Sequence, residues 1–173
     1  MRRIRYSVAM SLDGYIAGPN GESDWIIMDP SIDFAALFSQ FDTILVGRRT
    51  FEPMARAGRA TMPGMKTVVL STTLRQKDFP SVTVITANAH EYVASLKASS
   101  GKDVWLFGGG ELFRRLLKTG LVDTVEVAVI PLLLGGGIPL LPAPSNKAGL
   151  ELTGHRIYPT GVVALEYSIK AAA

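Results

Sequence analysis

The sequence predicts an α/β fold with a mostly parallel central sheet, helices on both faces and an antiparallel hairpin at the C-terminal end. Apolar runs of strand length alternate with helical patterns through residues 1–130. These runs are nearly continuous, as in strands covered on both faces, which is typical of parallel sheets. The segment Glu151–Lys170 instead reads as two alternating stretches joined through Pro159-Thr160-Gly161, a hairpin signal.

The elements follow in chain order from these patterns. The predicted strands are Ile4–Met10, Thr43–Val46, Thr67–Ser71, Val82–Thr86, Asp103–Phe107 and Thr124–Ile130. The predicted helices are Ile32–Gln40, Thr50–Ala57, Ala89–Lys97 and Glu111–Lys118. The 173 residues match the usual size of one domain, and the sequence shows no internal repeat or linker. We therefore expect a single domain over residues 1–173.

The composition excludes several classes of protein. The chain has no cysteine, which excludes disulfides and thiolate metal sites, and its two histidines, His90 and His155, are far apart in sequence. We therefore expect no metal site. The net charge of +3 is spread along the chain, unlike the concentrated basic surface of a nucleic-acid binder. The apolar run Ile130–Pro142 is too short and too interrupted to span a membrane. We expect a soluble cytoplasmic protein with a small-molecule substrate and no nucleic-acid or membrane partner.

The stretch VWLFGGGELFRRLL, Val104 to Leu117, predicts a phosphate-binding turn. A buried strand ends at three glycines, and an amphipathic helix begins after them. Glycine lets the backbone approach a ligand closely, and the free N–H groups at a helix start attract anions. The alternative is a tight turn that glycine serves only for packing.

A second candidate turn is VGRRTFEPM, Val46 to Met54. A strand ends at Gly47, and Thr50 is placed to cap or begin the next helix. Arg48 and Arg49 would then lie beside a positive helix end, and the arginine fork suits phosphate. The alternative is a solvated helix start.

A third strand end carries Ser71, Thr72 and Thr73. Three hydroxyls there suit a phosphate or a ribose, and equally Ser71 or Thr72 is a plain cap. The chain has no G-x-G-x-x-G motif with an acidic residue after it, so the standard dinucleotide fold is not indicated. Anion-binding chemistry at three strand ends of one sheet favours a nucleotide site.

The loop Asp13–Trp25 is rich in Gly, Pro and Asn yet carries Tyr15, Ile16 and Trp25. Loops with large apolar anchors often form lids or pocket walls, and Trp25 is equally able to plug the core. The polar loop Arg56–Lys66 is placed to flank the same cleft.

The series AMSLDGYIAG, VGRRTF, VVLS, VWLFGGGELF and VDTVEVAVIPLLLGGG, in this order, resembles the dihydrofolate reductase superfamily. It is most similar to the branch grouped with the C-terminal reductase domain of the bifunctional riboflavin-biosynthesis protein. The resemblance extends from about Arg3 to Tyr167. It implies a three-layer dihydrofolate-reductase-like fold, a single reductase-like domain and an oxidoreductase that uses NADPH.

The resemblance also implies cofactor positions. Ala9 and Ile16 would hold the nicotinamide, and the run Phe107 to Phe113 would wrap the pyrophosphate and its ribose. Arg48 with Thr72 favours NADPH over NADH, because the additional phosphate needs a cation and donors. The implied cofactor residues are Ala9, Ile16, Gly47, Arg48, Arg49, Thr50, Leu70, Ser71, Thr72, Phe107, Gly108, Gly109, Gly110, Glu111, Leu112 and Phe113.

Departures from the family pattern concern the substrate. Met65 stands where dihydrofolate reductases carry an arginine for the folate carboxylate, and a thioether cannot pair with a carboxylate. The usual pterin-binding threonine is replaced by Ala128 or Val129. Phe107 stands where the riboflavin-pathway enzymes carry an acid. Neither folate nor the ribosylamino-pyrimidine is therefore the predicted substrate.

Hydride transfer to a C=N or C=C bond needs a proton source as well. Asp33, expected in the first turn of a helix, is the predicted catalytic acid, and Asp29 is the second choice. The alternative for Asp33 is that it only complements the helix dipole. Tyr15 and Trp25 are predicted to stack on a flat substrate, with Asp29 near it.

The predicted function is an NADPH-dependent reductase of a small flat heterocyclic or conjugated molecule. The alternatives are a pyrimidinone reductase of riboflavin biosynthesis, a weak dihydrofolate reductase, or a non-catalytic nucleotide-binding regulatory protein. A homodimer is expected from the apolar segment Val125–Leu141 and from the dimeric relatives that the resemblance implies.

Overall fold

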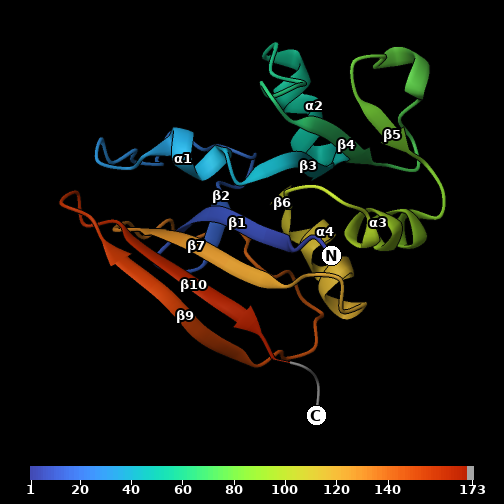
Figure 1. Ribbon diagram of the computed structural model, residues 1–173. Helices are drawn as coiled ribbons and strands as arrows, with labels where there is room; N and C mark the ends of the chain where they lie inside the picture. Colours follow the sequence, from blue (N-terminus) through green and yellow to red (C-terminus); the bar gives the residue numbers. More distant parts are fainter. Residues whose placement is uncertain (171–173) are drawn as a thin grey trace.

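An eight-stranded sheet with the order β5-β4-β3-β6-β1-β7-β10-β9 runs through the computed structural model, which describes residues 1–170 (Figure 1). Its strands are β1 (Ile4–Ser11), β3 (Phe41–Gly47), β4 (Lys66–Leu70), β5 (Thr83–Ile85), β6 (Asp103–Gly108), β7 (Thr124–Ile130), β9 (Leu150–Ile157) and β10 (Val163–Ile169). Neighbouring strands from β5 to β7 are parallel. Strand β10 runs antiparallel to both β7 and β9. The parallel sheet with an antiparallel C-terminal hairpin is thus confirmed.

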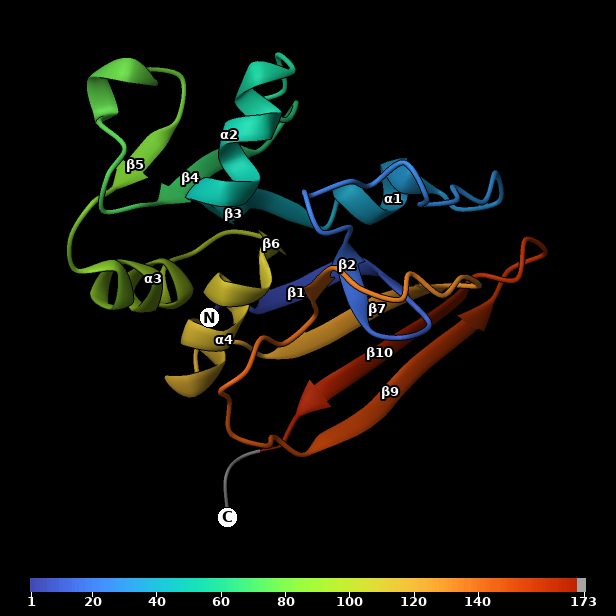
Figure 2. The ribbon, with the colours of Figure 1, turned by 180° about the vertical axis from the view of Figure 1, so that it is seen from behind.

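Helices cover both faces of this sheet (Figure 2). They are α1 (Phe34–Phe38), α2 (Arg48–Arg56), α3 (Ala89–Ala98) and α4 (Gly110–Lys118), with a short 3₁₀ helix at Gln76–Asp78. Residues of α3 and α4 pack into one core cluster, and residues of α1 and α2 pack into the other. Alternate residues of one strand contribute to opposite clusters, as with Val104 and Trp105 of β6. The three-layer arrangement follows from this alternation.

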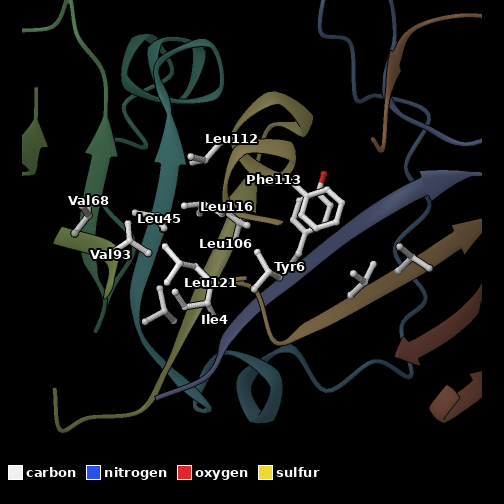
Figure 3. Packing of buried hydrophobic residues seen from close by; sticks show 14 residues of the cluster. Ile4, Tyr6, Leu45, Val68, Val93, Leu106, Leu112, Phe113, Leu116 and Leu121 are labelled. Carbon is white, nitrogen blue, oxygen red and sulfur yellow. The ribbon is translucent and has the colours of Figure 1, made fainter. Parts of the chain in front are cut away.

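The core beneath α4 is centred on an aromatic pair. Tyr6 of β1 and Phe113 of α4 stack with their ring centroids 4.0 Å apart (Figure 3). Both side chains are buried, and burial raises the pKa of the Tyr6 phenol well above its usual range. This packing fixes the start of α4 over β1 and β6.

The opposite face of β1 and β7 carries a buried ion pair. Arg5 donates to both carboxylate oxygens of Glu126, at 2.7 and 2.8 Å, and also to the Gln40 amide oxygen at 2.6 Å. The two charged side chains are 6% and 10% exposed. Burial acts to lower the pKa of Arg5, but Glu126 and Asp103 outweigh it and raise the pKa. The pair joins two neighbouring strands near their amino-terminal ends.

We expect Arg5→Lys to lower the free energy of unfolding by about 2 kcal/mol, because an ammonium cannot reproduce the two-pronged contact with Glu126. Denaturation with urea measures this change. Arg115→Lys on α4, where the side chain is exposed, is the matched control and should leave the stability unchanged. Equal stabilities of the two variants would contradict the importance of the fork geometry.

The structure differs from the sequence prediction at several elements. The predicted helix Ile32–Gln40 is only Phe34–Phe38, because Asp33 is its N-cap and accepts the N–H of Ala36 at 2.8 Å. Helix α2 begins at Arg48, not at Thr50, with Gly47 as its N-cap.

A small second sheet was also outside the prediction. It pairs β2 (Tyr15–Ala17) with β8 (Ile138–Pro139). Strands of three and two residues are too short to carry a period-two pattern. Among residues 1–170, no helix has the length and apolar character that a membrane crossing requires.

Candidate functional site

Two helix N-termini converge at the carboxyl ends of β3 and β6. Gly47 is the N-cap of α2 and Gly109 is the N-cap of α4, and neither helix has a side-chain cap. A Cβ built on Gly47 would lie 3.7 Å from the Leu112 Cβ, and one on Gly109 would lie 3.2 Å from the Thr50 hydroxyl oxygen. Both helix starts therefore border one space, and the positive ends of both dipoles meet there. This arrangement is a cradle for an anion.

Each glycine of the triplet has its own structural reason. Gly108 has φ +142°, a conformation that side chains rarely adopt, and its peptide bond to Gly109 is cis. A Cβ on Gly110 would lie 2.6 Å from the Pro139 carbonyl oxygen and 2.9 Å from Pro142. The packing interpretation therefore holds for Gly110, because the start of α4 rests against the 139–142 segment. Close packing at Gly110 is compatible with anion binding by the backbone of the same triplet.

Beside α2, an arginine is held in position by the turn after β4. The Arg48 guanidinium donates to the Thr73 hydroxyl at 2.9 Å. Ser71 accepts the N–H groups of Thr73 and Leu74, at 3.2 and 3.1 Å, so its hydroxyl caps this turn. Thr72, the expected partner of Arg48, is exposed beside this contact. Thr73 is the residue that the site analysis of the sequence missed, although the run of three hydroxyls contained it.

The other residues of the two turns have different surroundings. Arg49 is exposed at the start of α2, and Leu70 ends β4 opposite Gly47. Glu111 forms an ion pair with Arg114 on α4.

Leu112 and Phe113 point into the core, and their N–H groups already donate to the Gly109 carbonyl oxygen at 3.0 and 3.1 Å. Their side chains therefore serve the core, and their contact with a cofactor stays a prediction. The N–H groups of Gly110 and Glu111 are the ones placed at the open end of the helix.

Three residues of β1, β6 and β7 share the face of the sheet that α1 and α2 cover. Ala9 of β1 lies opposite Ala128 of β7, and alternation places Phe107 of β6 on the same face. Of the two residues expected in the position of the pterin-binding threonine, Ala128 lies on this face, whereas Val129 lies on the opposite face of the sheet. Phe107 packs edge to face on Trp105, with the ring centroids 5.1 Å apart. Met65 is half-buried against the core beneath α1 and α2. Its thioether cannot pair with a substrate carboxylate as an arginine would.

The first part of the predicted lid is fixed in place. Tyr15 and Ile16 belong to β2, which pairs with β8. The Asp13 carboxylate accepts the Ser11 hydroxyl at 2.6 Å and the N–H groups of Leu134 and Gly135 at 3.0 and 2.7 Å. These hydrogen bonds, the one from Ser11 most strongly, lower the pKa of Asp13 to about 2. The segment Asp13–Ala17 is therefore tied to residues 134–139 by hydrogen bonds and by strand pairing.

Asp29 anchors the far end of the same loop. Its carboxylate is 1% exposed. It accepts four hydrogen bonds, from the N–H and hydroxyl of Ser31 at 2.8 and 2.6 Å and from those of Thr160 at 3.1 and 2.8 Å. The hydrogen bonds from Ser31 and Thr160 hold the pKa of Asp29 well below its usual range. All four donors come from the protein, so Asp29 ties its loop to the turn at Thr160, and its contact with a substrate stays a prediction.

Trp25 lies between Asp13 and Asp29 in the sequence, and Asp33 lies between Asp29 and α1. The Trp25 indole donates to the Glu22 carbonyl oxygen at 3.0 Å, and the side chain is half-buried. It belongs to neither core cluster, so it is not a core plug. Asp33 is exposed and lies just before α1 as its N-cap, one residue outside the helix in whose first turn it was expected.

Comparison with known proteins identifies the family. The family model described as the RibD C-terminal domain matches residues 2–164, so the chain belongs to this family. It is similar to YyaP of Bacillus subtilis (strain 168), with 35% identity over 178 positions that cover 96% of this chain and 94% of that protein. A solved structure described as a riboflavin biosynthesis protein of Shewanella sp. PV-4 has 27% identity and a TM-score of 0.81, covering 99% of this chain and 100% of that one.

The fold extends to dihydrofolate reductase. The enzyme of Enterococcus faecalis, solved with NADP(H) and RAB-propyl, has a TM-score of 0.68 at 20% identity, covering 96% of this chain and 94% of that one. At this identity the likeness concerns the fold alone. The resemblance to the RibD branch is confirmed by the family model, and membership of this family supports a reductase role.

Proposed function

We propose that the protein is an NADPH-dependent reductase of a small flat heterocyclic or conjugated molecule. The observation that carries this proposal is the meeting of two uncapped helix N-termini beside an arginine already held by a threonine. NADPH carries anionic groups at two separate places, the pyrophosphate and the 2′-phosphate. The site offers hydrogen-bond donors at two places as well, the paired helix N-termini and the Arg48 guanidinium. The family membership and the fold shared with a dihydrofolate reductase solved with NADP(H) support the same proposal.

The residues divide the task as follows. The N–H groups of Gly110 and Glu111 would bind the pyrophosphate, together with the start of α2 at Arg49 and Thr50. Arg48, Ser71, Thr72 and Thr73 would surround the 2′-phosphate, while Leu70 would border the adenine. Ala9 and Ile16 would contact the nicotinamide, which supplies a hydride when the cofactor is bound.

The substrate would lie on the surface formed by Ala9, Ala128 and Phe107, with Tyr15 of β2 and Trp25 of the following loop stacked on it. Small alanine side chains on two adjacent strands leave room for a planar ring, and Phe107 offers an apolar neighbour to it. Hydride and proton add to the two atoms of one double bond. The proton would come from Asp33 or from a water molecule that Asp33 orients.

The proposal is tested first by thermal melting with NADPH, NADH, NADP⁺ and AMP in parallel. The largest rise in melting temperature should come with the 2′-phosphorylated dinucleotides. Oxidation of NADPH is then followed with a panel of acceptors that includes dihydrofolate and the ribosylamino-pyrimidine of riboflavin biosynthesis. No shift with any nucleotide would refute the cofactor assignment. Binding of NADPH without turnover of any acceptor would instead favour a regulatory nucleotide-binding protein.

We expect Arg48→Ala to weaken NADPH binding by roughly 10- to 100-fold, because one charge-assisted contact with the 2′-phosphate is lost. Thr73→Val should have a smaller effect in the same direction. NADH, which lacks that phosphate, should bind equally to both variants and to the original protein. Titration calorimetry measures the affinities, and Arg56→Ala at the other end of α2 is the control. Equal losses for both nucleotides would show that Arg48 does not recognise the 2′-phosphate.

A further inference from the structure

A cavity of about 180 Å³ lies at the amino-terminal ends of β1 and β7. These strands contribute Arg5 and Thr124 to it, whereas the cradle lies at the carboxyl ends of β3 and β6. Helix α1 contributes Leu37, and the antiparallel strands β9 and β10 contribute Thr153 and Glu166. Seven of the eight residues that line the cavity are polar or charged, the exception being Leu37. This lining differs from the apolar surface proposed for the substrate, so the cavity is a separate candidate for a ligand.

Two carboxylates of this cavity stand on neighbouring strands. Glu126 of β7 and Glu166 of β10 are directly opposite in the antiparallel register, so both side chains are on the same face of the sheet. Directly opposite residues of antiparallel strands have Cβ atoms roughly 4.5–5.5 Å apart, and like charges in this position destabilise a sheet. The sheet is therefore more stable when positive charge lies beside both glutamates.

The arginines of the cavity neutralise only one of these two carboxylates. Arg5 donates to both oxygens of Glu126. Arg3 donates to Asp103 instead, at 3.0 and 2.6 Å. Glu166 forms no ion pair within residues 1–170. Two arginines thus stand against three carboxylates, which leaves one negative charge in excess at Glu166.

The edge strand leaves room at the Glu166 carboxylate. Gly154 of β9 lies opposite Glu166, next to a β-bulge in which Thr153 is the additional residue. A Cβ built on Gly154 would lie 3.3 Å from the Glu166 Oε2 atom, so the carboxylate extends over the bare glycine backbone. The Thr153 hydroxyl donates to the Glu166 carbonyl oxygen at 3.1 Å, and its oxygen keeps lone pairs that can accept a hydrogen bond. The bulge therefore places two acceptors, the Glu166 carboxylate and the Thr153 hydroxyl, beside one cavity.

The excess charge and these acceptors together define the class of ligand. An anion would add to the negative charge, and a calcium ion takes about six to eight oxygen ligands, more than one carboxylate and one hydroxyl supply. A protonated primary amine brings one positive charge and N–H donors, and Leu37 offers an apolar neighbour to its alkyl chain. We propose that this cavity binds a small primary ammonium ion through Glu166 and Thr153. The site is independent of the proposed reductase activity.

Titration of the full chain with propylammonium chloride, without any nucleotide, tests the proposal. Tetramethylammonium chloride at the same concentration is the control that has the charge but no N–H donor. In ¹H–¹⁵N correlation spectra, propylammonium should shift the amide signals of Thr153, Gly154 and Glu166, and tetramethylammonium should not. Glu166→Gln should weaken the binding of propylammonium by roughly tenfold or more, because the charge-assisted contact is lost. Glu91→Gln at an exposed position of α3 makes the same change in net charge and should bind as the original protein does.

Glu166→Gln also tests the charge excess by itself. Without the amine, this variant should melt roughly 1–3 °C above the original protein, because the like charge opposite Glu126 is removed. A lower melting temperature would show that Glu166 is already neutralised within the chain, and this would overturn the proposal. Equal responses to the two ammonium ions would overturn it as well, since only general screening would then act. The same holds for unchanged binding in a folded Glu166→Gln variant, and for amide shifts caused by calcium chloride but not by propylammonium.

Discussion

We expect Gly110→Ala to weaken NADPH binding by roughly 100-fold and to lower the free energy of unfolding by about 2–3 kcal/mol. The added methyl group would lie 2.6 Å from the Pro139 carbonyl oxygen and 2.9 Å from Pro142, so the start of α4 must move away from that segment. This movement displaces the N–H groups of Gly110 and Glu111, which are proposed to bind the pyrophosphate. Titration with NADPH and urea denaturation measure the two effects.

Gly136→Ala is the matched control for this experiment. A Cβ on Gly136 meets no atom within 4 Å, and its backbone conformation is not restricted to glycine. The control should retain both stability and NADPH affinity. If Gly110→Ala binds NADPH normally while losing stability, the triplet is a packing turn and the proposed cradle is wrong. If neither property changes, the contact with the 139–142 segment does not fix the helix.

The fold could be predicted from the sequence because its signals are local. The strand Thr124–Ile130 is found where the apolar run predicts it, and the hairpin turns close to Pro159-Thr160-Gly161. The three strand ends were also visible, since glycines and hydroxyls follow directly after apolar runs. Their meeting in space required the strand order, in which β3 lies between β4 and β6.

The individual roles of site residues could not be predicted in the same way. Asp29 was predicted to lie near the substrate, and the hydrogen bonds that it accepts from Thr160 could not be predicted because Thr160 lies 131 positions away. Leu112 and Phe113 follow two and three residues after the last glycine, and helix periodicity turns their side chains into the core. Thr73 stands beside Thr72 in the sequence, and only the conformation of the turn shows which hydroxyl meets Arg48.

The Asp29 and Asp13 carboxylates together narrow the choice of a proton donor. Both accept several hydrogen bonds from the protein, and these bonds favour the ionised form of each group. A group held ionised in this way is a poor general acid. Asp33, the predicted acid, is exposed and accepts one hydrogen bond from the helix that it caps. It is the carboxylate on which the proposed proton transfer can be tested.

We expect Asp33→Asn to lower the rate of acceptor reduction by about 100-fold or more while leaving the fold intact. Asparagine is as good an N-cap as aspartate, so the hydrogen bond to the Ala36 N–H is retained and only the acid is removed. Stopped-flow oxidation of bound NADPH, with an acceptor found in the screen, measures the step directly. The melting temperature and the NADPH affinity should equal those of the original protein.

Asp33→Ala separates the two roles of this side chain. It removes both the acid and the cap, so it should match Asp33→Asn in rate while losing about 1 kcal/mol of stability. The dependence of the rate on pH gives a further criterion, because a titrating acid produces a limb that the asparagine variant lacks. An asparagine variant with the full rate and the same pH profile would mean that Asp33 only caps α1. The proton would then come from a water molecule held without its help.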